Sequence, residues 1–188
     1  MTTRIIKVLT MRLYTALCRY RFAHWGRGSH IAWRAMRLKG EKYISVGDGT
    51  FIDSGVQLTA WDSHNGLRFT PSITIGNHCA IRNNAHITAI NSITIGDDLL
   101  TGTNVLITDN SHGMTTREHM CLPFNERPMV SKGPVVIGSK VWLGNNVCVM
   151  SGVTIGDGVI IGANSVVTHD VPAYSVAVGI PAKVIKQL

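Results

Sequence analysis

The sequence predicts an all-β fold, a solenoid of short parallel strands, and three observations predict it. An aliphatic residue returns at every sixth position from Ile137 to Val167. A small or branched residue follows each of them four positions later, as Val141 follows Ile137. Helices repeat apolar residues at three and four positions and strands at two, so a strict period of six indicates a hexapeptide solenoid. Gly, Asn and Asp cluster between the apolar positions, where turns need residues that tolerate positive φ.

The N-terminal segment, residues 1–42, differs from the repeats in its charge. It holds ten Lys and Arg residues against one acid, Glu41, for a net charge of +9, whereas the remainder of the chain carries −2. Its apolar residues recur at helical spacing. They are Ile5, Ile6, Leu9, Leu13, Leu17 and Tyr20. We expect a mainly helical cap that covers the open end of the solenoid, as repeat proteins require.

Basic residues interrupt every apolar run of this segment. Neither a transmembrane span nor the core of a signal peptide is therefore expected. The basic face suits weak peripheral contact with an anionic membrane, and such contact is compatible with capping.

Residues 43–188 form the predicted solenoid. Sets of three hexads begin at Val46, Ile75, Ile95, Ile137 and Ile155. Three hexads make one triangular coil, which predicts about five coils. Aromatic residues are 6% of the chain against 45% apolar residues, which suits the narrow interior of such a prism. Residues 173–188 form a C-terminal tail.

Two long interruptions, 61–74 and 113–136, both follow the third hexad of a coil. Both are therefore expected to leave from the same edge of the prism. The longer one, which we call the flap, is of a length that is usually functional in a compact domain. It carries more apolar residues than a solvated loop needs, so we expect it to pack on a neighbouring subunit. These residues are Met114, Met120, Leu122, Phe124 and Met129.

His112 stands immediately before the flap, in T-D-N-S-H-G. We expect it at a corner outside the apolar interior, where an imidazole can titrate near neutral pH and act as a general acid or base. Asp109, three residues earlier, is expected to bind the substrate and orient this imidazole, or to serve as a turn residue instead. The other seven histidines are expected to be surface or turn residues.

The four cysteines show no paired spacing, and Cys79 falls on an inward repeat position. This pattern favours reduced cysteines in a cytosolic chain. No metal-binding spacing of Cys and His is present, so no metal is expected.

The five uninterrupted hexads from Ile137 and the G-I-P-A-K-V-I segment at 179–185 resemble the hexapeptide-repeat acyltransferases. The resemblance covers roughly residues 43–188. It implies a left-handed parallel β-helix and a homotrimer whose active sites lie between subunits. The segments K-G-E-K-Y-I-S-V-G-D-G and W-D-S-H-N-G are most similar to acetyltransferases of lipopolysaccharide and capsule biosynthesis.

This resemblance implies an acetyl-CoA-dependent O-acetyltransferase that modifies a sugar hydroxyl, with His112 as general base. It is expected in the cytoplasm or at the inner face of the cytoplasmic membrane, with no nucleic acid as partner. Asn84, in I-R-N-N-A-H, matches a substrate-binding asparagine of similar enzymes, although an Asn at a turn also simply suits αL geometry. Because Asn84 and His112 are expected on different edges of one prism, they would meet only across a subunit boundary.

Other positions are implied to bind the acyl donor. They are Trp142, Gly144, Asn145, Ala163, Thr168, Lys183 and Lys186. There is a physical reason to expect the two lysines to bind the donor. The phosphates of coenzyme A need positive charge, and the solenoid carries little positive charge elsewhere.

Alternatives stay open on the same solenoid. A γ-type carbonic anhydrase needs three histidines converging on zinc, and here His78 and His86 are expected on a different coil from His112. A non-catalytic solenoid would act as a binding or scaffold surface, but it would need no corner histidine beside a long flap. Among acetyltransferases, an enzyme of free sugars of the maltose or galactoside type is the nearest alternative.

Overall fold

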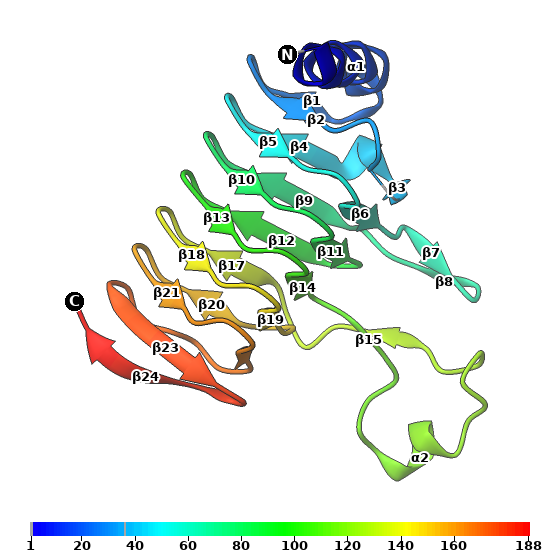
Figure 1. The fold of residues 1–188 in the computed structure, drawn as a ribbon. Helices are drawn as coiled ribbons and strands as arrows, with labels where there is room; N and C mark the ends of the chain where they lie inside the picture. The colour runs from blue at the N-terminus through cyan, green and yellow to red at the C-terminus, as the bar shows by residue number, and fades with distance from the viewer. Residues whose placement is uncertain (1, 36) are drawn as a thin grey trace.

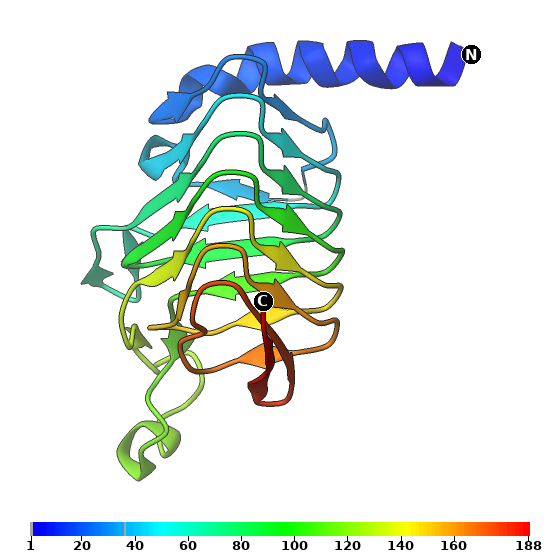
Figure 2. The same cartoon turned by 90° about the vertical axis from the view of Figure 1, so that its left-hand side faces the viewer.

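The computed structural model describes residues 2–35 and 37–188, and it shows a left-handed β-helix with a helix across one end (Figures 1 and 2). Three sheets, here named A, B and C, form the sides of a triangular prism. The predicted fold class is confirmed. Each coil contributes one short strand to each sheet, and the chain turns a corner between strands.

Sheet A contains β1 His24–Trp25, β4 Ile44–Val46, β9 Ser72–Ile75, β12 Ser92–Ile95, β17 Val135–Ile137 and β20 Thr154–Ile155. Sheet B contains β2 His30–Ile31, β5 Phe51–Ile52, β10 Ala80–Ile81, β13 Leu100–Thr101, β18 Trp142–Leu143, β21 Ile160–Ile161, β23 Ser175–Gly179 and β24 Ala182–Gln187. Sheet C contains β3 Arg37–Lys39, β6 Gln57–Ala60, β11 His86–Ala89, β14 Leu106–Thr108, β19 Cys148–Val149 and β22 Val166–Val167.

The remaining elements lie outside the prism sides. They are α1 Thr2–Cys18, the 3₁₀ turns η1 Arg19–Arg21 and η2 Glu41–Tyr43, the pair β7 Ser63–His64 and β8 Leu67–Arg68, the pair β15 Ser111–His112 and β16 Met129–Val130, and α2 Arg117–Met120.

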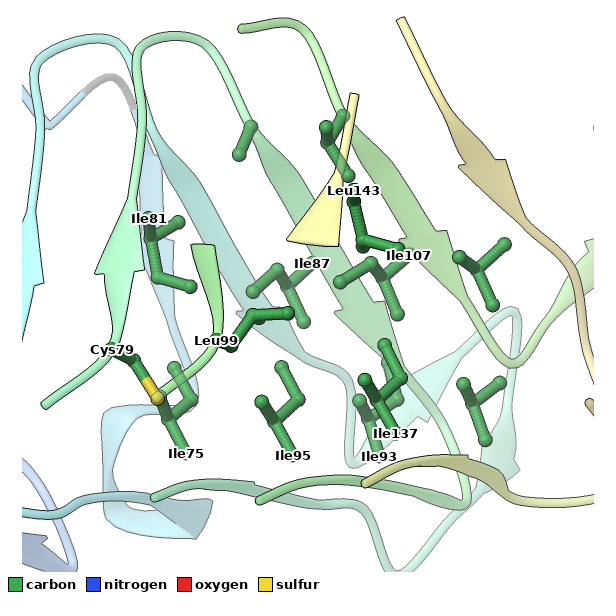
Figure 3. Packing of buried hydrophobic residues seen from close by; sticks show 14 of the residues in the cluster. Ile75, Cys79, Ile81, Ile87, Ile93, Ile95, Leu99, Ile107, Ile137 and Leu143 are labelled. Atoms are coloured by element: carbon green, nitrogen blue, oxygen red, sulfur yellow. The ribbon is translucent and has the colours of Figure 1, made fainter. Parts of the chain in front are cut away.

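The core is a set of aliphatic columns that run along the prism axis (Figure 3). Parallel pairing holds coils in register, so Leu58, Ile87 and Ile107 stack as successive members of one column. All three are fully buried, as the period of six predicts. Burying one such side chain stabilises the fold by about 1.5–3 kcal/mol.

One corner of the prism carries a ladder of asparagines. At this corner the chain turns from sheet B to sheet C in each coil. Asn84, Asn104, Asn146 and Asn164 all have positive φ. Each side-chain amide donates to the next Oδ1, at 3.1, 3.1 and 2.9 Å. The ladder explains why Asn recurs there, since Asn tolerates αL backbone and also bonds between coils.

The solenoid begins earlier than predicted. β1, β2 and β3 form a complete coil before residue 43, so sheets A and C have six strands each. The boundary expected at 42/43 is therefore wrong, and five coils is one too few. Trp25, Ile31 and Leu38 supply the inward side of this coil. Trp25 replaces the usual aliphatic residue, and Leu38 follows Ile31 after seven residues instead of six, which hid the repeat.

The helix α1 covers the end of the prism, as expected, but with a different face. Thr15 accepts a hydrogen bond from Ile31 N at 3.0 Å, and Cys18 and Phe22 join the core. The predicted apolar stripe points away, with Leu13 64% and Leu17 70% exposed. The side chain of Ile5 lies outside the described residues. Capping therefore uses small and aromatic residues rather than the leucines.

Candidate active site

Both long interruptions leave the prism at the corner between sheets C and A, which confirms that prediction. The first folds into the β7–β8 hairpin. The second forms the antiparallel ribbon β15–β16, which carries α2 and projects far from the prism (Figure 1). The side-chain amide of Asn65 in the hairpin bonds the carbonyl of Asn125 in the flap. The two excursions therefore meet beyond the corner.

His112 is held by the base of this ribbon. Its Cα pairs with Met129 of β16, and Gly113 N donates to Pro128 O at 2.7 Å. The imidazole is exposed and meets the edge of the His64 ring, with 5.5 Å between ring centroids. The predicted corner location of His112 is confirmed, and His64 is its closest aromatic partner among the described contacts.

A cavity of about 320 Å³ lies on the outer face of sheet C beneath these two rings. Its lining residues are Arg37, Thr59, Trp61, His64, His86, Thr88, Asn110, His112 and Met129. Three histidines thus face one space. Even so, within residues 2–35 and 37–188, no group of three His, Cys, Asp or Glu side chains is arranged to hold a metal ion.

One wall of this cavity is formed by Arg37 and Trp61. The Arg37 guanidinium lies 5.1 Å from the centroid of the Trp61 ring, and the ammonium of Lys39, which does not line the cavity, lies 3.3 Å from it. Burial lowers the pKa of His86, and the charge of Arg37 acts in the same direction. His86 therefore stays neutral at neutral pH, and the fixed positive charge of this wall comes from Arg37.

A second cavity of about 380 Å³ lies on the flap side of the same two imidazoles. It is lined by His64, Asn65, His112, Phe124, Asn125 and Arg127. The His64–His112 pair is thus the wall between a polar cavity on sheet C and a more apolar one under the flap. A reactant on either side of the pair can reach the imidazole of His112.

Asp109 has a structural role and does not face the cavity. It is fully buried, and its two carboxylate oxygens accept hydrogen bonds from Ile90 N at 2.9 Å and Asn91 N at 2.8 Å. These bonds fix the corner of the preceding coil. The suggested contact of Asp109 with substrate is therefore wrong, and of its two expected uses the turn is the one present.

We expect Asp109→Ala to lower the free energy of unfolding by about 2–4 kcal/mol, because the buried N–H of Ile90 and the partly buried N–H of Asn91 both lose their acceptor. Urea denaturation followed by circular dichroism measures this change. The exposed Asp157→Ala serves as the control, since its oxygen bonds only at an exposed turn. Equal denaturation midpoints for the two variants would contradict the structural role.

The positions expected to bind the acyl donor lie on another side of the prism. Trp142 is half exposed on sheet B, and Gly144, Asn145 and Ala163 follow at the corner between sheets B and C. Lys183 and Lys186 are exposed on β24 at the end of sheet B. Thr168 is exposed at the other corner, between sheets C and A, with Oγ1 2.8 Å from His169 Nδ1.

The width of sheet C separates most of these positions from His112 within one chain. Asn84 likewise stands in the asparagine ladder at the corner between sheets B and C, away from the corner of His112. The structure therefore does not bring the expected acceptor and donor residues together in a single protomer.

Four residues of the cavity were missed by sequence reasoning: Arg37, Trp61, His64 and His86. The motif W-D-S-H-N-G marked the hairpin but gave no sign that His64 would meet His112, because that contact depends on how the hairpin folds back. His86 faces outward at the start of β11. It lines a cavity only because the two excursions form the other walls around it.

Comparison with known proteins agrees with this geometry. The family described as "Bacterial transferase hexapeptide (six repeats)" matches residues 134–169. The chain is 38% identical over 153 residues to the "Putative lipopolysaccharide biosynthesis O-acetyl transferase WbbJ" of Escherichia coli (strain K12), covering 80% of this chain and 74% of that protein. The chain belongs to the hexapeptide-repeat acyltransferases. It is accordingly an acetyltransferase that uses an acyl-CoA donor.

Other relatives of this family are also similar. The chain is 32% identical over 181 residues to the "Probable acetyltransferase Rv3034c" of Mycobacterium tuberculosis (strain ATCC 25618 / H37Rv), covering 92% of this chain and 56% of that protein. The acetyltransferase VCA0836 of Vibrio cholerae O1 biovar eltor, solved with acetyl coenzyme A, is 27% identical with a TM-score of 0.59, over 92% of this chain and 75% of that chain. The N-acyltransferase AntD of Bacillus cereus shares the fold, with a TM-score of 0.73 at 20% identity, over 92% of this chain and 87% of that chain.

Proposed function

We propose that this enzyme transfers an acetyl group from acetyl-CoA to a sugar hydroxyl in surface-polysaccharide biosynthesis. The observation that carries the proposal is the exposed His112 on the wall between two cavities, one of which is of sugar size and offers the side chains of Arg37, Asn110 and His86 for hydrogen bonds. The similarity to an enzyme named for lipopolysaccharide O-acetylation supports the choice of acceptor.

The proposed chemistry needs one base that later acts as an acid. The imidazole of His112 accepts the proton of the acceptor hydroxyl as its oxygen attacks the thioester carbonyl carbon. The tetrahedral intermediate then collapses, the carbon–sulfur bond breaks, and the imidazolium returns the proton to the leaving thiolate. The products are the acetyl ester and free coenzyme A. Arg37 in the wall of the cavity would hold an acceptor that carries negative charge.

We further propose a homotrimer with composite active sites. What supports it is the contrast between the outer faces of the sheets. Sheet B presents the apolar residues Leu100 and Trp142, 45 and 50% exposed, whereas the matching column of sheet A has the exposed threonines Thr94 and Thr154 on either side of Val136, which is 37% exposed. An apolar outer column marks a contact surface. A neighbour packed on sheet B would bring its own His112 corner toward the donor positions around Trp142.

The deciding experiment is a screen of acyl-CoA donors and sugar acceptors, read out as free thiol. The expected result is thiol release that requires both acetyl-CoA and a sugar with a free hydroxyl. Amino sugars serve as the paired test, since amide formation would assign nitrogen as the acceptor atom. Thiol release that is independent of every acceptor would overturn the proposal.

Removal of the flap tests the acceptor side separately. We replace residues 114–128 with a short Gly-Ser turn that still joins β15 to β16, and we expect acceptor KM to rise by at least about tenfold, since the flap builds one wall of the second cavity. Coenzyme A binding, measured by calorimetry, should stay within about twofold, because the donor positions lie on sheet B. An equal loss of acceptor affinity and coenzyme A binding would mean that the flap has only a structural role.

A further inference from the structure

The outer side of α1 and of the following turn η1 carries an apolar stripe that stays exposed within the described part of the chain. Ile6, Leu9, Leu13 and Leu17 of α1 and Tyr20 of η1 are 54, 60, 64, 70 and 76% exposed. The spacing of three and four residues places the four residues of α1 in one row along the helix, and Tyr20 follows them. Contiguous exposed apolar patches of this kind on soluble proteins mark interaction sites.

The stripe points along the axis of the prism. Tyr14, Thr15 and Cys18 face the first coil, and with 3.6 residues per turn the stripe falls on the opposite side of the helix. The helix α1 runs across the end of the prism, and its N-terminal part extends beyond the prism edge (Figure 2). Leu13 and Leu17 therefore face outward from that end, whereas Ile6 also lines a hollow with Trp33 and Phe51 beside sheet B.

Beside the stripe lies a basic cavity of about 300 Å³. Its charged lining comes from Arg12, Arg19 and Arg27, of which Arg27 is paired with Asp48 outside the lining, with 3.9 Å between Nε and Oδ2. His30 also lines this cavity, and its buried Nδ1 has no hydrogen-bond partner in the described part of the chain. Such a set of donors suits a phosphate group.

Charge decides between two classes of partner for this surface. Residues 1–42 carry a net charge of +9, and the one acid, Glu41, is already paired with Arg21 at 2.7 Å. End-to-end pairing of two copies would bring two such ends together and would be opposed by repulsion. An anionic bilayer offers apolar depth for the stripe and phosphates for the guanidinium groups.

We infer that α1 docks the enzyme on an anionic lipid bilayer. The stripe enters the interface, while Arg12, Arg19 and Arg27 contact lipid phosphates. Over residues 2–35 and 37–188, no helix is long and apolar enough to cross a membrane, so α1 lies in the plane of the surface. The inference stands on this surface alone and does not depend on the acceptor proposed above.

Flotation of the full chain with vesicles tests the inference. We expect flotation with vesicles of phosphatidylcholine plus phosphatidylglycerol but not with phosphatidylcholine alone. Binding should fall as salt shortens the Debye length from about 30 Å at 0.01 M to about 8 Å at 0.15 M. Absence of flotation with the anionic vesicles at low salt would overturn the proposal.

Matched variants separate the apolar and charged contributions. Leu9→Gln, Leu13→Gln and Leu17→Gln together should reduce flotation to background, and Arg12→Gln with Arg19→Gln should weaken binding about thirtyfold. Phe124→Gln, exposed on the distant flap, should bind like wild type. Circular dichroism and acetylation of a water-soluble acceptor should not change in the leucine variant, so a failure of docking is distinct from a failure of catalysis.

Light scattering tests whether the stripe instead binds a second copy of the chain. If wild type forms end-to-end assemblies that the leucine variant loses, and neither protein floats with anionic vesicles, the stripe is a protein interface and the membrane proposal is wrong. Flotation of the leucine variant at the wild-type level would equally overturn it.

Discussion

His112→Ala is expected to lower kcat/KM for acetyl transfer by a factor of about 100 to 10,000, because it removes the group that takes the acceptor proton. The thermal midpoint should stay nearly unchanged, since the side chain is exposed and lies outside the core. Acetyl-CoA binding should also remain, because the donor positions lie on another side of the prism. Thiol release measured over a range of acceptor concentrations gives kcat/KM.

A matched control separates catalysis from a general effect of losing a histidine. His24→Ala removes an exposed imidazole from β1, in the first coil, and should retain wild-type turnover. Near wild-type turnover of His112→Ala would remove the general-base assignment. An equal loss in both variants would point to an effect of the substitution on the fold.

Ile87→Ala is expected to lower the free energy of unfolding by about 2–5 kcal/mol. Ile87 is fully buried at the centre of a column, between Leu58 and Ile107 of the adjacent coils, so its removal leaves a cavity that neighbours on both sides cannot fill. In a solenoid each coil is stabilised by its neighbours alone, so the defect weakens two interfaces. Chemical denaturation at fixed protein concentration gives the value.

Two further variants calibrate this loss. Ile87→Val removes one methylene and should cost about 0.5–1.5 kcal/mol. Ile185→Ala, at a side chain that is 64% exposed on β24, should change stability by no more than about 0.5 kcal/mol. If all three variants unfold at the same denaturant concentration, the assignment of the core column is wrong.

The prism itself was predictable because its constraint is local and periodic. Each inward position accepts only an aliphatic or small residue. The repeat from Ile137 to Val167 therefore predicts the fold even when no tertiary contact is known. The first coil escaped prediction because Trp25 is not aliphatic and Leu38 follows Ile31 after seven residues instead of six. A six-residue repeat cannot be recognised in one coil when the spacing within that coil is irregular.

The site was predictable only in part, since it depends on structure outside the repeats. His112 could be located because it borders the longest interruption, and its corner follows from counting hexads. His64 and Trp61 could not, because their positions come from the folding of the β7–β8 hairpin over sheet C. Asp109 shows the reverse error: its nearness in sequence to His112 suggested a role in the site, whereas its side chain holds the preceding coil.

The most direct test of the account is the identity of the bond formed. Acetyl-CoA labelled in the acetyl group is incubated with the enzyme and an active sugar acceptor, and the product is examined by nuclear magnetic resonance. The account predicts an alkali-labile acetyl ester on a sugar hydroxyl, formed in step with free coenzyme A and absent with His112→Ala. A labelled amide, or free acetate with unmodified sugar, would contradict it.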